Sequence, residues 1–215
     1  FSFNSEGFPK SRNFRQLIFY LKYFILIREW LKESQNEIPE YLNEIIFNLG
    51  QAYNFSWQNT NQSFLFNGNH LVDNSNFDKY LKLHGYKFKN ESNECGGYII
   101  LKNKNILLTA DIGFAPEKKF SNNYQSGTLS FEAYFKGKKL ISNSGYFQNY
   151  KHQLNSISKS TASHSTLTID NRSSTKLKKN TDGSLIINKA AKIIKKNIVS
   201  EKDYFNIVAS HDGYL

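Results

Sequence analysis

His164 stands in the segment TASHSTLTID, which runs from Thr161 to Asp170. The segment alternates like a β-strand, with small or apolar side chains on one face and His164 on the other. A strand rich in serine and threonine needs no histidine to fold, and imidazole can both accept and donate a proton. His164 is therefore either a packing detail with a local hydrogen bond or an inward-facing part of a site.

Other side chains with suitable chemistry precede this segment in the chain. Tyr150 or His152 could transfer a proton, with ordinary loop residues as the alternative, and Tyr146 nearby is expected to be an ordinary loop residue. Arg12 has a planar guanidinium group that matches a carboxylate or sulfate. Alternatively, Arg12 has a structural role at the start of a helix and pairs with Glu6.

The first part of the chain has the periodicity of helices. Residues 14–33 carry apolar side chains on nearly every face, which predicts a helix buried among other helices. Charged residues interrupt its apolar stretch, which is also too short to span a bilayer, so we expect no membrane insertion. A second helix is predicted to begin at Pro39 and to stop at Gly50. A third, NFDKYLKLHG, should end at Gly85, and the segment SFLFNGNH before it should be a turn-rich loop.

From about Ser92 the pattern changes to the alternation of strands. The segments 98–102 and 106–111 predict one hairpin, and TLSFEAYFKGKKLISNSG predicts a second that turns at residues 136–138. Further strands are predicted at HSTLTID, GSLIIN, AKIIKKNIVS and DYFNIVASHDG, whereas the lysine-rich STKLKKNTDGS is expected to be a solvated loop. Helices followed by many strands indicate an α+β protein.

The composition is that of a globular protein with one or two domains. Of 215 residues, 39% are hydrophobic and 21% charged, and the formal net charge is +10. Such a charge favours an anionic partner, namely nucleic acid, a membrane surface or an acidic polysaccharide, or else reflects a solvated lysine-rich surface. The lysines are spread and no nucleic-acid-binding motif is present, so we expect no nucleic acid partner. Cys95 has no second cysteine with which to form a disulfide.

The chain contains no methionine and ends at SHDGYL, within a predicted strand system. We therefore expect it to be part of a longer protein, whose export signal could lie upstream. The compartment and the oligomeric state do not follow from these residues. A periplasmic or cell-envelope location is a working expectation only.

Several segments, in this order, resemble the heparinase II/III-like family of polysaccharide lyases. QSGTLSFEAYFKGKKLISNSG is similar to the family's His-Ala-Asp/Gly and Leu-Ser-Phe-Glu block, and SKSTASHSTLTIDNRSS is similar to its Arg-x-Thr-Ala-Ala-His-Ser/Asn-Thr block. ADIG, SHDGYL, SEGFPKSRNFRQL and FLFNGN add to the resemblance, which extends over the whole chain. It implies the last helices of an incomplete α/α toroid at residues 1–90, followed by an antiparallel β-sandwich at residues 91–215.

The resemblance also implies a chemistry. Lyases of this family cleave uronate-containing polysaccharides by β-elimination, which requires neutralisation of the carboxylate, a base for the C5 proton and an acid for the leaving oxygen. Carried over by position, the catalytic set implied here is Asn123, Gln125, His164 and Gln16, and the substrate-binding set is Arg12, Asn13, Tyr150 and Lys159. Asn123 and Gln125 stand where some members have histidine, and neither accepts a proton as imidazole does.

Some members of the family hold a metal with two histidines and one aspartate. Here the matching positions are His164, Gln125 and Asn143, and one neutral histidine is a poor site for a divalent cation. We therefore predict no metal and no other cofactor. The function predicted is that of a lyase-like protein acting on an anionic uronate-containing glycan. The alternative is a non-catalytic or divergent glycan-binding or cell-envelope protein on the same scaffold.

Overall fold

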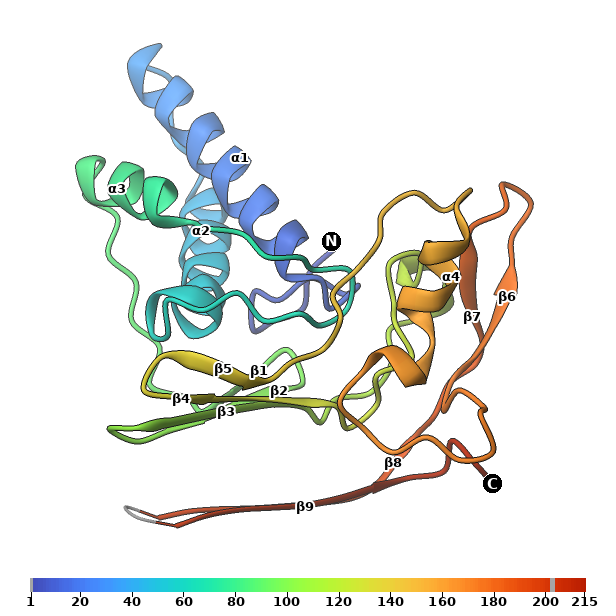
Figure 1. Ribbon diagram of the computed structural model, residues 1–215. Coiled ribbons are helices and arrows are strands. Elements are labelled where there is room, and N and C mark those ends of the chain that lie inside the picture. Colours follow the sequence, from blue (N-terminus) through green and yellow to red (C-terminus); the bar gives the residue numbers. More distant parts are fainter. Residues whose placement is uncertain (1, 202–203) are drawn as a thin grey trace.

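The computed structural model describes residues 2–201 and 204–215, and it shows helices followed by strands (Figure 1). Helices α1 (Phe14–Glu33), α2 (Glu40–Tyr53) and α3 (Ser75–Leu83) lie on one side of an antiparallel sheet, and a π-helix at Asn54–Gln58 extends α2. The expected α+β class is confirmed. Among the described residues, no helix is both long and apolar enough to cross a membrane.

Helix α1 begins and ends where the sequence predicts, but it is not buried on every side. Its start is fixed by Asn13, whose side-chain oxygen accepts hydrogen bonds from the amides of Arg15 and Gln16. One face packs into the core through Phe14, Leu17, Leu21 and Ile25. The opposite face is exposed along Phe19, Tyr23, Ile27 and Trp30, because among the described helices only α2 packs closely along α1.

Helix α2 continues past Gly50, so the predicted stop at this glycine is wrong. A Cβ atom on Gly50 would lie 2.0 Å from the ring of Phe88, which packs against this turn of the helix. Glycine is therefore present to make room for an aromatic ring and not to end the helix. The third helix does end before Gly85, whose φ of +77° is that of a typical helix-terminating glycine.

The sheet contains five antiparallel strands in the order in which they occur in the chain. They are β1 (Glu94–Cys95), β2 (Tyr98–Lys102), β3 (Ile106–Asp111), β4 (Phe131–Phe135) and β5 (Lys138–Ile141). Both predicted hairpins are confirmed. In the first, Tyr98 lies opposite Asp111, which places these two side chains on the same face of the sheet.

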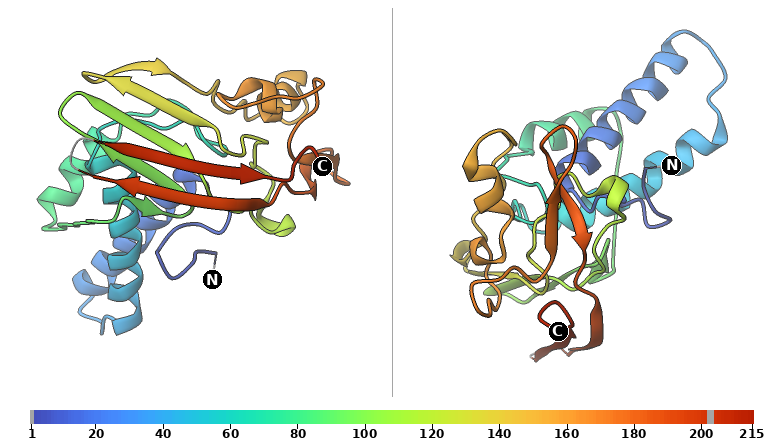
Figure 2. Two further views of the ribbon diagram at one scale, coloured as in Figure 1. Left: turned by 90° about the horizontal axis from the view of Figure 1, so that it is seen from below. Right: turned by 90° about the vertical axis from the view of Figure 1, so that its right-hand side faces the viewer.

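The two faces of the sheet have different partners. On one face Ile99, Leu101 and Ala110 contact the hairpin of β8 (Ile193–Ser200) and β9 (Phe205–His211), which lies across the sheet in Figure 2. The other face carries Tyr98, Ile100 and Tyr134 and shares one hydrophobic core with the helices. The same face also holds buried polar residues, including Thr109, Asp111 and Glu132. Asp111 and Glu132 bind the loops that connect helices and sheet, whereas the hydroxyl group of Thr109 has no hydrogen-bond partner among the described residues.

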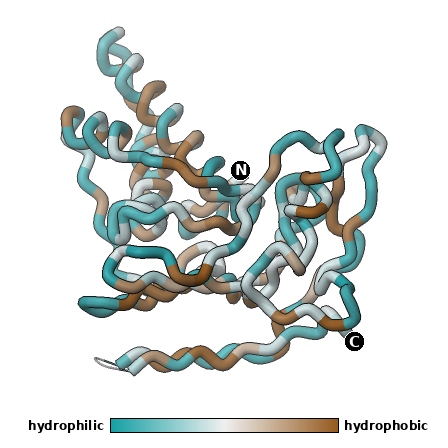
Figure 3. The backbone as a smooth tube through the Cα atoms, viewed as in Figure 1, coloured by the Kyte–Doolittle hydropathy of each residue, from teal (hydrophilic) through white to brown (hydrophobic). Residues whose placement is uncertain are grey.

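A separate hairpin is formed by β6 (Lys176–Lys179) and β7 (Leu185–Lys189), so the expected loop at STKLKKNTDGS is partly a strand. The lysines of β6 are exposed and give this part of the chain its hydrophilic character in Figure 3. Lysine is common on exposed strand edges because it stays solvated and discourages further pairing. The sequence pattern thus revealed the charge of this segment but not its pairing.

The segment TASHSTLTID is not a strand. Thr161–Ser163 form a 3-10 turn, and the residues after it are irregular except for a single bridge between Ile169 and Arg172. Its hydroxyl groups bind neighbouring backbone in place of a strand ladder: Thr161 donates to Ser126 O at 2.6 Å and Thr166 to Thr128 O at 3.0 Å. Side-chain hydrogen bonds of this kind compete with regular secondary structure.

Helix α4 (Gln153–Lys159) was not predicted. It is only seven residues long and mostly polar, so it lacks an apolar periodicity that sequence reading can detect. His152 begins it by accepting a hydrogen bond from the amide of Leu154 through Nδ1 at 3.2 Å.

A buried ion pair between Arg12 and Asp111 joins the N-terminal segment to the sheet. Nη2 of Arg12 lies 2.7 Å from Oδ1 of Asp111, and the guanidinium also donates to the carbonyls of Gly96 and Gly97 at 3.0 and 2.9 Å. Arg12 therefore pairs with Asp111 and not with Glu6, the partner considered for it from the sequence. Arg12 has a φ of +59°, an uncommon conformation for a residue other than glycine.

Glu132 is a second polar connection between loops and sheet. Its Oε2 accepts hydrogen bonds from Leu65 N at 3.3 Å and from Lys139 Nζ at 3.1 Å, and its Oε1 accepts one from Asn143 N at 3.0 Å. One buried carboxylate thus fixes the loop before Gly68 and the segment that follows β5.

The Arg12–Asp111 pair leads to a prediction about stability. Asp111→Asn should lower the free energy of unfolding by about 3–5 kcal/mol, because it leaves the buried guanidinium without its counter-charge. Chemical denaturation monitored by tryptophan fluorescence would measure the change. Glu94→Gln is the matched control, since it breaks the Glu94–Lys196 pair, whose side chains are each 37% exposed. An exposed pair should contribute less than about 1 kcal/mol. Equal losses in the two variants would contradict the importance assigned to Asp111.

Candidate functional site

The turn at Gly68 lies where the start of α1 meets the segment before β4. Gly68 has a φ of +80°, and a Cβ atom there would lie 2.4 Å from Asn13 Nδ2 and 2.7 Å from Asn123 Cβ. The three residues are therefore in close contact although they are far apart in the sequence. Only glycine allows this approach at this backbone conformation.

Gln125 supports the Gly68 turn from the interior of the protein. Its Oε1 accepts a hydrogen bond from Gly68 N at 3.0 Å, and its Nε2 donates to the carbonyls of Gly145 and Ser158 at 3.0 and 2.6 Å. Gln125 is only 1% exposed, so its amide serves to connect three segments. The structure thus places Gln125 beneath the site and not on its surface.

Tyr146 and Asn123 form the accessible part of the site. The hydroxyl group of Tyr146 donates to Asn123 Oδ1 at 3.1 Å, and both residues are half-buried. The amide of Tyr146 is bound to Asn69 O at 3.0 Å, which places Tyr146 beside the loop that carries His70. We call Asn13, Arg15, His70, Asn123 and Tyr146 the junction site.

Arg15 supplies the positive charge of the junction site. It extends from the first turn of α1, and its Nη1 donates to Gln148 Oε1 at 3.3 Å. Burial lowers the pKa of His70, and the charge of Arg15 lowers it further. Burial raises the pKa of Tyr146, and the charge of Arg15 opposes this rise. Near neutral pH the site therefore offers an uncharged imidazole that can accept a proton and a phenol that can donate one.

Lys159 lies behind the junction site at the end of α4. It is 1% exposed, and its ammonium group donates to the carbonyls of Asn122 and Leu185, the latter at 2.7 Å. Burial lowers the pKa of Lys159 to about 8. Because Asn122 precedes Asn123 in the chain, Lys159 holds the backbone that carries the accessible asparagine.

His164 lies away from the surface of the junction site. Its Nδ1 is 2.8 Å from Ser160 O, and since a carbonyl can only accept, Nδ1 carries the hydrogen. Burial lowers the pKa of His164, so the ring is neutral and its Nε2 keeps a lone pair with no partner among the described residues. The ring packs against Gly127, where a Cβ would lie 2.7 Å away.

The residues at the positions of the family's metal ligands do not fit a divalent cation. The Gln125 amide is committed to hydrogen bonds on both sides, and Oδ1 of Asn143 accepts one from Ser165 N at 2.9 Å. No group of three histidine, cysteine or acidic side chains suited to a metal occurs among the described residues. A lone neutral imidazole is a weak ligand set.

The structure brings some of the predicted residues together and separates others. Asn13, Asn123 and Gln125 surround the Gly68 turn, and Lys159 binds the backbone next to Asn123. Gln16 lies in the first turn of α1, where it accepts a hydrogen bond from Ser11. Arg12 is turned into the protein toward Asp111, and Tyr150 is exposed on the loop before α4. Sequence analysis missed Arg15 and His70, although His70 directly follows the FNGN turn and so could have been noticed.

The burial of Lys159 leads to a prediction about pH. Its folded pKa is depressed from 10.5 to about 8, so folding releases a proton between these values. As pH rises through this window, the wild type should gain stability relative to Lys159→Met, by up to about 3 kcal/mol. Denaturation curves at about pH 7.5 and about pH 10.5 would measure it. Lys151→Met is the matched control because Lys151 is exposed in the neighbouring loop. A difference that does not vary with pH would contradict the burial of a titrating amine.

Comparison with known proteins gives one family match and several similar folds. The family described as Heparinase II/III-like, C-terminal, matches residues 91–215. No curated protein matches the chain. A crystal structure of a mutant of heparan sulfate lyase HepC from Pedobacter heparinus is similar with a TM-score of 0.73 and 15% identity, covering 99% of this chain and 36% of that one. A crystal structure of heparinase III gives a TM-score of 0.60 and 15% identity, covering 91% of this chain and 35% of that one.

These likenesses show a shared fold, and the chain spans about a third of the length of the solved relatives. The family match covers more than half of the chain. The chain therefore belongs to the heparinase II/III-like family.

Proposed function

We propose that this chain is part of a polysaccharide lyase that cleaves an anionic, uronate-containing glycan by β-elimination. In this proposal residues 1–90 are the last helices of an incomplete α/α toroid and residues 91–215 begin a β-sandwich. The protein to which they belong would act on the glycan outside the cytoplasm, in the periplasm or cell envelope. The observation that carries the proposal is the junction site, where Tyr146 binds Asn123 and the loop of His70, and where the charge of Arg15 acts on both His70 and Tyr146.

The reaction requires three groups, and the junction site can supply each of them. The C5 proton of a uronate is only weakly acidic, because its removal places more negative charge next to the carboxylate. Neutralising the carboxylate makes this proton easier to remove. Arg15 is placed to bind this carboxylate as a hydrogen-bond donor, because its guanidinium group lies at the edge of the site beside Gln148. Asn123 can add a hydrogen bond through its amide nitrogen, since its oxygen already accepts from Tyr146.

His70 and Tyr146 have the protonation states that the two proton transfers need. The lowered pKa of His70 leaves its imidazole unprotonated, so it can take the C5 proton. The C4–C5 double bond forms as the bond from C4 to the leaving oxygen breaks. The raised pKa of Tyr146 keeps its hydroxyl group protonated, so it can give a proton to that oxygen.

The remaining implied residues act in this proposal by positioning. Gln125 is buried and holds the Gly68 turn and the segment after β5, His164 is buried and binds the carbonyl of Ser160 after α4, and Gln16 fixes the start of α1. Arg12 is committed to Asp111, so Arg15 replaces it as the residue that contacts the substrate carboxylate. Tyr150 extends the binding surface along the exposed loop.

The first test is cleavage by the full-length gene product. Incubation with heparan sulfate, heparin and alginate should produce the ultraviolet absorbance of unsaturated uronates. Tyr146→Phe should reduce kcat by about 100-fold or more, because the proton donor is lost. Tyr41→Phe is the matched control, since Tyr41 is 63% exposed on α2. Failure to cleave any uronate-containing glycan, or equal activity of the two variants, would count against the proposal.

A second test concerns the base. Because only the neutral imidazole accepts a proton, kcat/KM of the wild type should rise with pH through the lowered pKa of His70 and then level off. The His70→Gln variant should lose most of the activity, and its kcat/KM should no longer show this rise with pH, the acidic limb of the profile. His84→Gln, on a histidine beside Glu29, should keep both. An acidic limb that survives in His70→Gln would assign the base to another residue.

One observation favours the second candidate function, a glycan-binding protein without cleavage. Gln125 and Asn143 lack the proton-accepting and metal-binding ability of the histidine and aspartate implied by the resemblance. This candidate predicts retention on immobilised heparin with no unsaturated product. The same assays therefore separate the two functions.

A further inference from the structure

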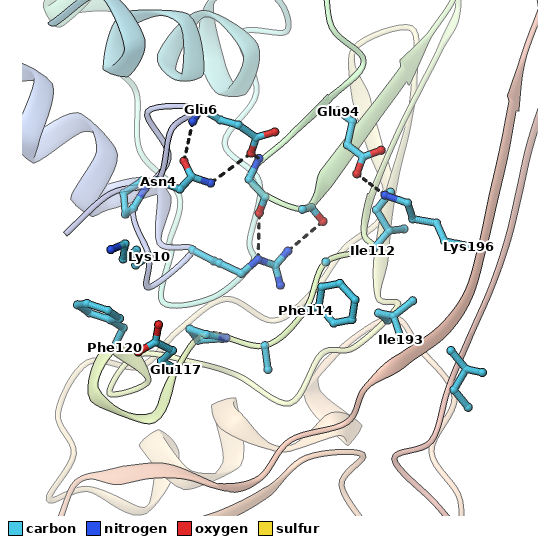
Figure 4. Close-up of a pocket in the computed structure, with 18 residues that line it drawn as sticks. Asn4, Glu6, Lys10, Glu94, Ile112, Phe114, Glu117, Phe120, Ile193 and Lys196 are labelled. Atoms are coloured by element: carbon cyan, nitrogen blue, oxygen red, sulfur yellow. Dashed lines mark hydrogen bonds and ion pairs between the residues drawn. The ribbon is translucent and has the colours of Figure 1, made fainter. Parts of the chain in front are cut away.

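Two large pockets lie outside the junction site, and they differ in charge. The first has a volume of about 550 Å³ and is formed by the N-terminal segment, the β1–β2 turn, the loop after β3 and strand β8 (Figure 4). Its charged lining residues are three acids and three bases, namely Glu6, Glu94, Glu117, Lys10, Arg12 and Lys196. Glu94 and Lys196 pair directly, as drawn in Figure 4. This pocket therefore offers no excess charge to a ligand.

The second pocket lies between the β6–β7 hairpin and the 3-10 turn Lys118–Phe120, and it has a volume of about 540 Å³. The amide of Ile187 in β7 donates to Ser121 Oγ at 3.1 Å, which joins the hairpin to the end of this turn. We call this space the hairpin pocket, and its lining residues are Glu117, Lys118, Lys119, Asn122, Asn180 and Ile186. Asn122 directly precedes Asn123 of the junction site, so the two sites adjoin the same segment of the chain.

The ammonium groups at the hairpin pocket outnumber the carboxylates. Glu117 is the only acid among the described lining residues, and it pairs with Lys119 at 3.0 Å. Lys178 lies directly opposite Ile186 in the hairpin, so its side chain is on the face that Ile186 presents to the pocket. Lys118 and Lys178 are both exposed, and neither has an ion pair among the residues that the structure describes. Both ammonium groups are therefore available to an anion.

The β6–β7 hairpin carries more positive charge than its own acid can balance. Residues 176–189 include four lysines and one acid, Asp182. Oδ1 of Asp182 accepts hydrogen bonds from the amide and the hydroxyl group of Ser184 at 2.9 and 2.6 Å, so this carboxylate serves the turn. Lys176 lies directly opposite Lys189, and like charges in this position destabilise a strand pair. Departures of this kind from local stability are expected at functional sites.

A buried ammonium group lies behind the hairpin pocket. Nζ of Lys159 donates to the carbonyl of Asn122, which lines the pocket, and to that of Leu185, which directly precedes the lining residue Ile186. Lys159 is 1% exposed, and it has no ion pair with an acidic side chain in the described part of the chain. Because an unpaired buried charge is costly, an anion in the adjacent pocket would stabilise it.

We propose that the hairpin pocket is an anion subsite that binds a sulfate or carboxylate group of a polysaccharide chain. Lys118 and Lys178 contact the anionic oxygens, and the side-chain amides of Asn122 and Asn180 donate hydrogen bonds to them. Lys159 acts through its charge, since burial keeps it from direct contact. A lipid surface is a poorer source of the anion, because the hairpin tip at residues 180–183 has no apolar side chain to insert.

The inference rests on the proposed function for the identity of the chain. A glycan bound at Asn123 can continue along the same segment to Asn122, so that one sugar unit is cleaved while another is held by its charge. The hairpin pocket then favours chains that carry an anionic group beyond the bond that is cleaved. Because this contact is the same before and during the reaction, it lowers KM and leaves kcat largely unchanged.

The test measures the binding of two hexasaccharides by isothermal titration calorimetry. A heparosan hexasaccharide carries only carboxylates, and a heparin hexasaccharide carries sulfates as well. Both are titrated into the full-length protein in the Tyr146→Phe background, which lacks the proposed proton donor. Lys118→Gln combined with Lys178→Gln should raise the dissociation constant by about tenfold, because two charge contacts are lost. Both lysines are exposed, so the double variant should fold.

Lys82→Gln combined with Lys104→Gln is the matched control, because it removes the same charge from exposed lysines on α3 and in the β2–β3 turn. An equal effect of the pocket variant on both hexasaccharides assigns the pocket to carboxylate, and an effect on the heparin hexasaccharide alone assigns it to sulfate. An unchanged dissociation constant for both, or an equal rise in the control, would overturn the proposal. The same holds if the two lysines affect binding to phosphatidylglycerol vesicles but to neither hexasaccharide.

The outcome is separable from that of the proposed function. If the protein cleaves no glycan but binding that depends on Lys118 and Lys178 is found, the lyase proposal fails while the anion subsite stands. If cleavage occurs and the pocket variant binds both hexasaccharides normally, the subsite fails while the lyase proposal stands.

Discussion

The buried contact of Arg12 with Asp111 is the interaction on which the rest of the structure depends. It connects the segment before α1 to the end of β3, and Arg12 also binds the β1–β2 turn through two carbonyls. Asn67 adds a hydrogen bond to the other carboxylate oxygen at 3.1 Å, and Tyr98 donates to Arg12 O at 2.7 Å. The Arg12–Asp111 pair and the hydrogen bonds around it thus connect four segments, namely the segment before α1, the β1–β2 turn, the end of β3 and the loop of Asn67. Because a buried charge is costly unless it is paired, this connection favours a single arrangement of helices and sheet.

The same constraint explains where the accessible sites are. With Arg12 fixed, Asn13 is placed at the start of α1, where it begins the helix and contacts the Gly68 turn. Arg15 follows two residues later, in the first turn of α1, and donates to Gln148 in the loop that follows Tyr146. On the other side, Arg12 lines a pocket together with Phe114 and the β1–β2 turn. The junction site and this pocket therefore share one short segment, and the buried Arg12–Asp111 pair fixes the position of both.

Polar residues at the junction have largely taken structural roles. Gln125 connects three backbone segments, Glu132 connects the loop before Gly68 to the end of β5, and Lys159 holds the backbone of Asn122. A glutamine can donate and accept at once, which a neutral histidine can do only at opposite ends of its ring. This explains how Gln125 stabilises the turn at a position where the resemblance implies a histidine, and why a metal is not needed to hold these segments together.

The sequence by itself determined that helices precede strands, the bounds of α1, and the first two hairpins, because their periodicity and turn residues are local signals. It also indicated the family and several residues around the Gly68 turn. Only the tertiary structure decided the partner of Arg12, the role of Gly50 and the irregular path of TASHSTLTID, since each depends on contacts with distant segments: Asp111, Phe88, and the backbone near Ser126. The same is true of Arg15 and His70. Their side chains belong to a helix and a loop that are separated in sequence, and packing alone brings them to one surface.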